Sequence, residues 1–424
     1  MNGLLIALLA TVSLFNVRDR GAVGDGFKTD TAALQAAIDA AAEAGGGVVR
    51  VPAGTYRCGS IFLKSNVTLD LAEGATIAAS HDSADYNAWD VCPQNVKSAV
   101  ENTSGGHLIL CIGQTNVTLR GRGTIEGGGR FFLTDGFDRG RVGATGRNDH
   151  GGFNPQDAIR WRPSSMIYFV ECADVRLEGL RFIDSPYWSV FLHGCERVAV
   201  DGITIRTSRK DPYIMNGDGL SLDCCRHVRV TGCDIETSDD ALCLRANGKR
   251  LLRAPAETSD VRIGNCTLSS TQDAIRIGVG EGRIRDCVLT NLVIRDSRNG
   301  INFSSTWFKS HGVDFEDILI SNVVSHTKFD FLRIHRLMSA DSLVRGITIA
   351  DVRGEQGSGS MIRARRAKPF RDILLKDIFL DKGVEVIGAE NLRIEGGTLK
   401  VLPRTKEELD ALDADIEAFR NLIH

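Results

Sequence analysis

The sequence of 424 residues predicts an all-β protein in which one chain winds into a single-stranded parallel β-helix. First, short stretches of alternating apolar and polar residues recur along most of the chain, as in Val175-Arg-Leu-Glu-Gly and Val228-Arg-Val-Thr-Gly. Second, from Val175 onwards these stretches begin at intervals of 19 to 33 residues, which is typical of stacked repeat units. Third, 45 glycines with only 9 prolines indicate many tight turns between short strands.

Each repeat is interpreted as one coil that holds two or three short strands. Alternation with a period of two buries one face of a strand, and the Gly, Asn or Asp that follows each stretch marks a turn. Such coils stack about 4.8 Å apart, so each one buries its apolar face against its neighbours. Leucine-rich repeats would need leucines at fixed spacings, and propeller blades would need four antiparallel strands, so neither architecture fits as well.

The first elements along the chain are an apolar run and a helix. Residues 3–15 are too short to span a bilayer, and they are interpreted as a first strand, with an export signal as the alternative. Residues 30–44 are rich in alanine and are predicted to form a helix that covers the N-terminal end of the stack and stops at Gly45. Residues 131–162 break the repeat and are rich in glycine and charge, so we expect a long loop beside the stack.

The last element is a second helix. We expect residues 1–403 to form the β-helix domain and residues 404–424 to form a short amphipathic helix after it. Thr405 and Glu408 make a capping box at its start, and an apolar stripe at helical spacing follows. The helix is interpreted as a cap on the last coils, and an oligomerisation helix is the alternative.

Charge and cysteine content restrict the partners and the compartment. The chain carries 51 basic and 54 acidic residues, a net charge of −3, which gives no electrostatic reason to expect nucleic acid or a membrane surface as a partner. Eleven cysteines, an odd number in a long chain, indicate buried free thiols rather than a disulfide framework. This favours a cytoplasmic location slightly over a secreted one. The cysteine spacings match no metal motif, so neither a metal nor a cofactor is predicted.

A ladder of acidic side chains is the strongest chemical signal in the sequence. We aligned one apolar-x-apolar strand from each coil. The first position of these strands reads, coil after coil, Trp188, Asp218, Asp240, Asp273, Asn299 and Asp330, and the outward position reads Phe191, Ser221, Cys243, Arg276, Asn302 and Arg333. Aligned side chains on neighbouring coils lie roughly 5 Å apart. Asp218, Asp239 and Asp240 are therefore predicted to form one cluster.

Three carboxyl groups in one cluster point to glycosidic bond cleavage. Like charges at this distance raise at least one pKa, and a glycosidase needs one protonated carboxyl group beside one carboxylate. The backbone must bend just before Gly219 and Ala241, because a regular strand would turn Asp218 into the core and would separate Asp239 from Asp240. The alternatives are aspartates that cap turns and a bound Ca²⁺.

The motifs Asn216-Gly-Asp218-Gly and Asp239-Asp240 resemble those of the polygalacturonase family, glycoside hydrolase family 28, within the pectin-lyase-like superfamily. The segments that begin at Asn16 (NVRDRGAVGDG) and Val51 (VPAGTY) are similar to the start of that family, and the resemblance covers most of residues 14–400. It implies a right-handed parallel β-helix that hydrolyses glycosidic bonds with inversion. It also implies that Asp239 is the general acid and that Asp218 and Asp240 hold and activate the water.

Two family motifs differ in this chain. The family's Gly-His-Gly aligns with Gln272-Asp273-Ala274, and its Arg-Ile-Lys aligns with Asn302-Phe303-Ser304, so the cations that bind an acidic sugar are replaced. Arg276 and Arg333 could supply a cation from new positions; otherwise the substrate is neutral, or the sugar binds in a different place. The side chains predicted to bind substrate are Asp273, Arg276, Asn302, Arg333, His335 and Trp188.

The predicted function is a glycoside hydrolase with polygalacturonase-like activity on a pectin-like or other polysaccharide or oligosaccharide. A carbohydrate is therefore the expected partner. Two alternatives remain open at this point. One is a uronate lyase or epimerase built on the same scaffold, and the other is a non-catalytic carbohydrate-binding β-helix.

Overall fold

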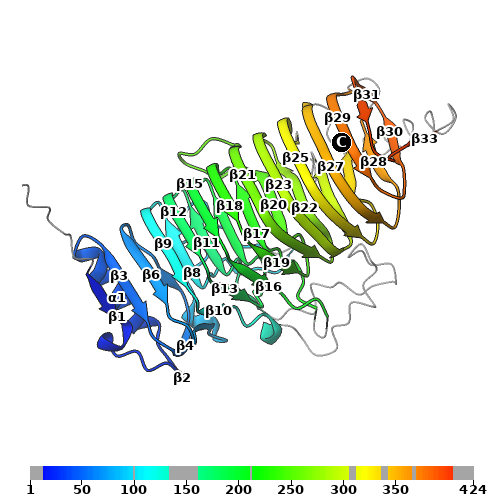
Figure 1. Ribbon diagram of the computed structural model, residues 1–424. Helices are drawn as coiled ribbons and strands as arrows, with labels where there is room; N and C mark the ends of the chain where they lie inside the picture. Colours follow the sequence, from blue (N-terminus) through cyan, green and yellow to red (C-terminus); the bar gives the residue numbers. More distant parts are fainter. Residues whose placement is uncertain are drawn as a thin grey trace, which may run out of the picture.

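The structure is a computed structural model that describes residues 13–98, 101–132, 161–210, 213–304, 312–335, 342–364 and 369–403. It is an elongated stack of coils, with the N-terminal helix at one end and the last strands at the other (Figure 1). Two parallel sheets, of 21 and 12 strands, run along the stack. The predicted all-β parallel β-helix is therefore confirmed.

The larger sheet contains two strands of each early coil, and these join into one long strand in the later coils. Its strands are β1 (Leu14–Asn16), β2 (Asp25–Thr29), β3 (Gly47–Val51), β4 (Gly54–Cys58), β6 (Val67–Leu71), β7 (Ala75–Ala79), β9 (Thr115–Gly121), β10 (Thr124–Glu126), β12 (Ala173–Glu178), β13 (Arg181–Ile183), β15 (Glu196–Asp201), β16 (Thr204–Arg206), β18 (Arg226–Thr231), β19 (Asp234–Thr237), β21 (Glu257–Ser270), β23 (Arg283–Ser297), β25 (Asp314–Thr327), β27 (Val344–Gln356), β29 (Phe370–Phe379), β31 (Ala389–Glu390) and β32 (Arg393–Glu395).

The smaller sheet contributes one strand per coil and carries the acidic ladder at the start of its strands. Its members are β5 (Ile61–Phe62), β8 (Ile109–Ile112), β11 (Ile167–Val170), β14 (Val190–His193), β17 (Leu220–Asp223), β20 (Leu242–Ala246), β22 (Asp273–Gly280), β24 (Asn299–Ser304), β26 (Leu332–His335), β28 (Ser360–Arg363), β30 (Val384–Ile387) and β33 (Val401–Leu402).

The turn residues that define the repeat adopt the backbone conformation that their side chains permit. Gly179, Asn265 and Asp351, each at the end of an alternating stretch, have φ of 72°, 57° and 54°. Gly, Asn and Asp tolerate this left-handed region better than other residues do. Asn291 donates from Nδ2 to Oδ1 of Asn265 at 3.1 Å, so the corner side chains also bond from one coil to the next.

The core is one continuous apolar column inside the coils. Within each alternating stretch the apolar residues are buried, and parallel pairing stacks them in register, as in Val175 on Val198 and Val198 on Val228. All eleven cysteines are free and buried, as the odd count predicted. No helix among the described residues combines the length and apolarity that crossing a membrane requires.

The N-terminal helix α1 (Thr31–Glu43) lies within the predicted span and buries Leu34 and Ile38 against the first coils. Its preceding residue, Asp30, does not cap it. The Asp30 carboxylate instead accepts hydrogen bonds from the backbone N–H groups of Val23 (2.7 Å) and Gly24 (2.9 Å).

Three short 3₁₀ helices complete the elements of the described residues: η1 (Val17–Arg20), η2 (Ser83–Asp85) and η3 (Gly129–Phe132). Three predictions fall wholly or largely outside the described residues. These are the helix over 404–424, the loop over 131–162 apart from its first and last two residues, and the apolar run at 3–15 apart from its end in β1.

Candidate active site

The predicted ladder of side chains is in register. Backbone N–H groups of Ser189, Gly219 and Ala241 donate to the carbonyl oxygens of Asp218 (2.8 Å), Asp240 (2.9 Å) and Asp273 (3.0 Å) on the next coils. Asp218 and Asp240 stand two residues ahead of strands β17 and β20, which begin at Leu220 and Leu242. Because both aspartates precede the regular strands, the alternation of faces does not govern their direction.

Two glycines permit the close approach of the chain beside Asp218. A Cβ on Gly217 would lie 2.2 Å from Oγ of Ser238, and a Cβ on Gly219 would lie 2.3 Å from the carbonyl oxygen of Ala241. Both distances are far below contact between non-bonded atoms, so only glycine fits at either position. The glycines that flank Asp218 thus let the coils of Asp218 and Asp240 pack closely.

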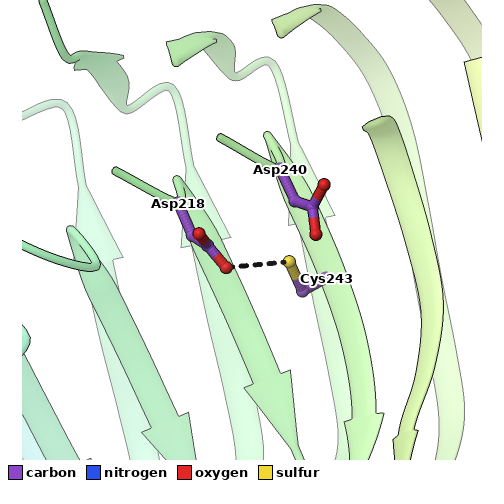
Figure 2. Close-up of side chains that lie close together, drawn as sticks. All are labelled: Asp218, Asp240 and Cys243. Carbon is purple, nitrogen blue, oxygen red and sulfur yellow. Dashed lines mark hydrogen bonds between the residues drawn. The ribbon is translucent and has the colours of Figure 1, made fainter. Parts of the chain in front are cut away.

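Asp218 and Asp240 lie together with Cys243, and Figure 2 shows all three on the outer side of the sheet. Their carboxylate oxygens and the thiol sulfur lie within 4.8 Å of one another. The Cys243 thiol donates to Oδ2 of Asp218 at 3.7 Å. Only two of these three donor atoms are oxygens, whereas Ca²⁺ takes about six to eight oxygen ligands.

Asp239 is half-buried at the edge of this group, and its main chain is fixed on two sides. Hydroxyl groups of Thr237 and Ser270 each donate to the Asp239 carbonyl oxygen at 2.6 Å. Oδ1 of its side chain accepts from the backbone N–H of Asp240 at 3.0 Å. The fixed backbone holds the Asp239 carboxyl group beside Asp240 and more exposed to solvent than Asp240 is.

The three carboxyl groups all have raised pKa values, for different reasons. Burial raises the pKa of Asp218 well above its usual value, and the charges of Asp239 and Asp240 raise it further. Burial, followed by the Asp240 charge, raises the pKa of Asp239 to about 8. Burial also raises the pKa of Asp240, but the Arg276 guanidinium opposes it and the value is about 6. The cluster therefore contains acids of different strength side by side.

Arg276 lies between two acidic residues of the ladder. Its Nη1 lies 3.1 Å from Oδ2 of Asp240 and 3.1 Å from Oδ2 of Asp273. Amide Nδ2 groups of Asn299 and Asn302 donate to the two oxygens of Asp273 at 2.8 and 2.7 Å. Both oxygens of the buried Asp273 carboxylate are thus engaged by other side chains, and Arg276 contacts one catalytic candidate, Asp240, directly.

The remaining predicted substrate-binding residues lie on either side of the trio. On the C-terminal side, Arg333 donates from Nε and Nη2 to the carboxylate of Asp330 at 2.9 and 2.7 Å. Nε2 of His335 lies 3.1 Å from Oδ1 of Asn302, and burial lowers the His335 pKa to about 3, so the ring is neutral at ordinary pH. On the N-terminal side, the Arg245 guanidinium lies 4.4 Å from the ring centre of Trp188.

The sequence did not reveal the role of Arg162, the last residue of the predicted 131–162 loop. Its buried guanidinium donates to Oδ1 of Asn216 at 2.9 Å and to the carbonyl oxygen of Met215 at 2.8 Å. It also reaches the carbonyl oxygens of Glu101 (2.6 Å) and Pro186 (3.1 Å). Arg162 therefore fixes the turn that precedes Asp218, and no spacing or motif in the sequence connects it with that turn.

An aromatic row on the N-terminal side was missed as well. Tyr168 precedes Phe191 in the same outward column, with ring centres 5.8 Å apart, and His107 stacks on Tyr168 at 4.4 Å. The ladder predicted from the sequence begins with the coil of Trp188, and Tyr168 lies one coil before it. Extending the same register by one coil would have found it.

Two loop segments cover this end of the smaller sheet. Oε1 of Glu171, just after β11, accepts from the backbone N–H groups of Leu252 (3.1 Å) and Ala254 (2.9 Å), and Oε2 accepts from Nε2 of Gln94 (2.5 Å). The apolar residues Cys92 and Leu251 pack over β8 and β11. The outward face of the sheet is therefore covered at β8 and β11, one strand beyond β14.

Several known proteins are similar in sequence to this chain. A "Probable polygalacturonase" of Vitis vinifera is 27% identical over 297 residues, which is 68% of this chain and 56% of that protein. "Mannuronan C5-epimerase AlgE5" of Azotobacter vinelandii is 38% identical over 141 residues, 30% of this chain and 13% of the epimerase. This chain thus spans little more than half the length of the grape protein.

A solved structure is similar over nearly the whole chain. The hyperthermoactive exopolygalacturonase of Thermotoga maritima superposes with a TM-score of 0.68 at 20% identity and covers 92% of this chain and 90% of its own. Its fold is a right-handed parallel β-helix, as the resemblance implied for this chain. A sequence model of "Glycosyl hydrolases family 28" matches residues 48–393. The chain therefore belongs to glycosyl hydrolases family 28.

Proposed function

We propose that the chain is a glycoside hydrolase that cleaves O-glycosyl bonds of a pectin-like polysaccharide or oligosaccharide, with inversion at the anomeric carbon. The observation that carries this proposal is the close approach of Asp218 and Asp240 from two successive coils, with Asp239 beside Asp240 and the pKa values of all three raised. Family membership and the similarity to a polygalacturonase support the same reaction class.

Asp239 is the general acid in this proposal. With a pKa raised to about 8, its carboxyl group holds a proton at neutral pH and can transfer it to the leaving glycosidic oxygen. Its greater exposure compared with the other two aspartates lets a bulky leaving group approach.

Asp218 and Asp240 hold the attacking water. Their carboxyl oxygens lie within 4.8 Å of each other, and one water molecule with hydrogen bonds of about 2.8 Å to each can bridge that gap. Asp240 is the base because Arg276 stabilises its ionised form. The water attacks the anomeric carbon as the glycosidic bond breaks, its proton passes to Asp240, and the leaving oxygen takes the proton of Asp239.

The substrate extends along the smaller sheet, across the coils. Nη1 of Arg333 is available to a ligand, because within the described part of the chain only Nε and Nη2 of Arg333 have a partner, the Asp330 carboxylate. Arg333 lies three coils from Cys243, about 14 Å along the stack. A uronate carboxylate would therefore meet Arg333 several coils from the cleaved bond. Sugar hydroxyl groups would contact His335 on the same strand and Asn302 one coil nearer to that bond.

The test of hydrolysis is a panel of pectin-derived and neutral glycans, with product analysis by proton NMR. We expect new reducing ends whose first-formed anomer is opposite in configuration to the cleaved bond. Asp239→Asn should lower kcat by roughly 10²- to 10⁴-fold while the circular dichroism spectrum stays unchanged. Full activity of this variant would refute the assignment.

The local similarity to a mannuronan C5-epimerase favours a second candidate, a uronate epimerase or lyase. Neither reaction consumes water at the anomeric carbon. A lyase would leave an unsaturated product that absorbs in the ultraviolet, and an epimerase would change the sugar configuration without any new reducing end. Either outcome from the same glycan panel would replace hydrolysis as the assigned reaction. Glycan binding that the loss of the three aspartates leaves intact, without any product, would instead identify a binding protein.

A further inference from the structure

The three aspartates of the cluster differ in what they contact, and the difference centres on Arg276. Oδ1 of Asp240 accepts from the backbone N–H of Asp273 at 3.1 Å, and its Oδ2 lies 3.1 Å from Nη1 of Arg276. Asp239 accepts from a neutral backbone N–H, and Asp218 accepts from a thiol. Among the described residues, Asp240 is thus the member of the cluster that forms an ion pair.

Arg276 is itself held in place by the following coil. Its second carboxylate partner, Asp273, is 3% exposed and accepts from Nδ2 of Asn299 and of Asn302. Oδ1 of Asn302 in turn lies 3.1 Å from the ring of His335. A chain of buried polar contacts therefore runs across three coils and ends at the base of the proposed hydrolysis.

We propose that Arg276 is a positioning residue that keeps Asp240 ionised and correctly placed as the base, so that Asp239 retains the proton of the acid. This inference rests on the proposed hydrolysis. It also gives Arg276 a different role from the substrate binding that the sequence suggested, because its Nη1 contacts the carboxylates of Asp240 and Asp273.

The charge distribution around Asp240 explains why one arginine is decisive. The charged and titratable groups that face Asp240 from its own and neighbouring coils are Asp218, Asp239, Cys243, Asp273 and Arg276. Asp218, Asp239 and Cys243 have higher pKa values than Asp240, so they are still protonated and uncharged where Asp240 ionises. Of the five groups, the Asp273 carboxylate therefore opposes ionisation of Asp240 and the Arg276 cation favours it. The positive charge of Arg276 also lies nearer to Asp240 than to Asp239, as the hydrogen bond to Asp240 indicates, so the two acids are affected unequally.

The test compares pH profiles of kcat/KM for the parent, Arg276→Gln and Arg276→Lys on a hydrolysed glycan. The acidic limb of such a profile reports the base of the free enzyme. Without the cation the base requires a higher pH to ionise, so we expect Arg276→Gln to move this limb upwards by at least one pH unit. Arg276→Lys, which keeps the charge, should stay within about half a unit of the parent.

Arg333→Gln is the matched control. Arg333 lies in the same outward column and pairs with the aspartate three residues before it, as Arg276 does, but its partner Asp330 is not part of the cluster. Its acidic limb should coincide with that of the parent, whatever its effect on substrate affinity. Equal limbs for parent and Arg276→Gln, or equal shifts for both glutamine variants, would overturn the proposal.

A measurement without substrate separates this proposal from the proposed function. Protein labelled with ¹³C at the aspartate carboxyl carbons is titrated by NMR, with Asp240→Asn to assign the Asp240 signal. In Arg276→Gln the Asp240 signal should titrate at least one pH unit higher than in the parent. An unchanged Asp240 titration in folded Arg276→Gln would refute the role of Arg276, even if every glycan is hydrolysed. A shifted titration without hydrolysis of any glycan would retain the role and reject the reaction.

Discussion

At the scale of single residues, the site is defined by carboxyl groups that the fold keeps away from water. Asp218 and Asp240 are each 5% exposed, and their burial is the largest cause of their raised pKa values. Keeping these acids buried therefore lowers the stability of the protein, because the same acids would be ionised in the unfolded chain. The activity and the stability of the protein depend on the same aspartates, and measuring each property as a function of pH distinguishes the two effects.

The stability of the protein should fall as pH rises, and Asp239→Asn should reduce that fall. In the folded protein Asp239 has a pKa of about 8, against an ordinary value of 3.8, so the folded chain holds a proton that the unfolded chain releases. Its contribution to stability is complete below about pH 4 and is lost as pH rises through about 8. Asparagine cannot ionise and avoids this loss.

Thermal unfolding at pH 5 and at pH 8.5 measures this effect. We define the gain as the Tm of Asp239→Asn minus the Tm of the parent. This gain should be larger at pH 8.5 than at pH 5 by at least about 2 °C. Asp372→Asn, the same chemical change at an exposed corner, is the control and should show no such pH-dependent gain. A constant difference between Asp239→Asn and the parent across pH would contradict the prediction.

At the scale of the elements, the turn before each strand of the smaller sheet determines where the acidic side chains point. The turn before β17 needs Gly217 and Gly219 on steric grounds, and Arg162 holds its start through Met215 and Asn216. The loop after β11 is held in a similar way by the Glu171 carboxylate. Small changes in these turns, rather than in the strands, therefore alter the positions of the side chains in the site.

Gly219→Ala should impair catalysis far more than it impairs folding. The added Cβ would lie 2.3 Å from the backbone carbonyl oxygen of Ala241, and this contact can be relieved only by moving the Asp218 turn away from the Asp240 coil. We expect kcat to fall by roughly 10²-fold, as misplacement of about 1 Å does in other enzymes. Gly264→Ala is the control, because its Cβ would meet Thr290 at 3.4 Å, an ordinary contact. Equal activity of the two variants would contradict this account.

The sequence predicted the repeat, its turn residues and the ladder because these depend on local chemistry. Alternation fixes the buried face, and an Asn such as Asn265 after it fixes a left-handed corner. Stacking identical positions then brings the aspartates together. The ion pair of Arg276 with Asp240 could not be predicted, because it depends on the direction of a long side chain. The role of Arg162 was hidden because its partner Asn216 lies 54 residues away in the chain.

At the scale of the whole molecule, the stack of coils provides a long outward face that is open near the cluster and covered towards the N-terminal end. The cover begins at β11, where Glu171 binds the 247–256 segment and Gln94, and Cys92 and Leu251 pack over the sheet. The strand β14 separates this cover from β17. The cover also reaches the end of β14, where Nε2 of His193 lies 3.1 Å from the carbonyl oxygen of Asn247. Towards the N-terminus the glycan therefore has room for about one coil, roughly 5 Å.

A closed end near the cluster should restrict cleavage to the end of a glycan chain. We expect short products from the first minutes of digestion, with a slow fall in the viscosity of a polymer solution relative to the release of reducing ends. Replacing residues 249–253 by a shorter linker should open the face and speed the loss of viscosity per bond cleaved. Rapid loss of viscosity with the parent protein would show internal cleavage and contradict this prediction.

The corner hydrogen bonds between asparagines repeat from coil to coil, from Asn291 to Asn265 and from Asn322 to Asn291. Insertion or loss of one complete coil therefore leaves every other corner, with its bonds, in an unchanged environment. Such an event lengthens or shortens the glycan platform by about 4.8 Å without disturbing the chemistry beside it. Duplication of whole coils is thus a simple evolutionary route from this scaffold to relatives that bind longer stretches of polymer.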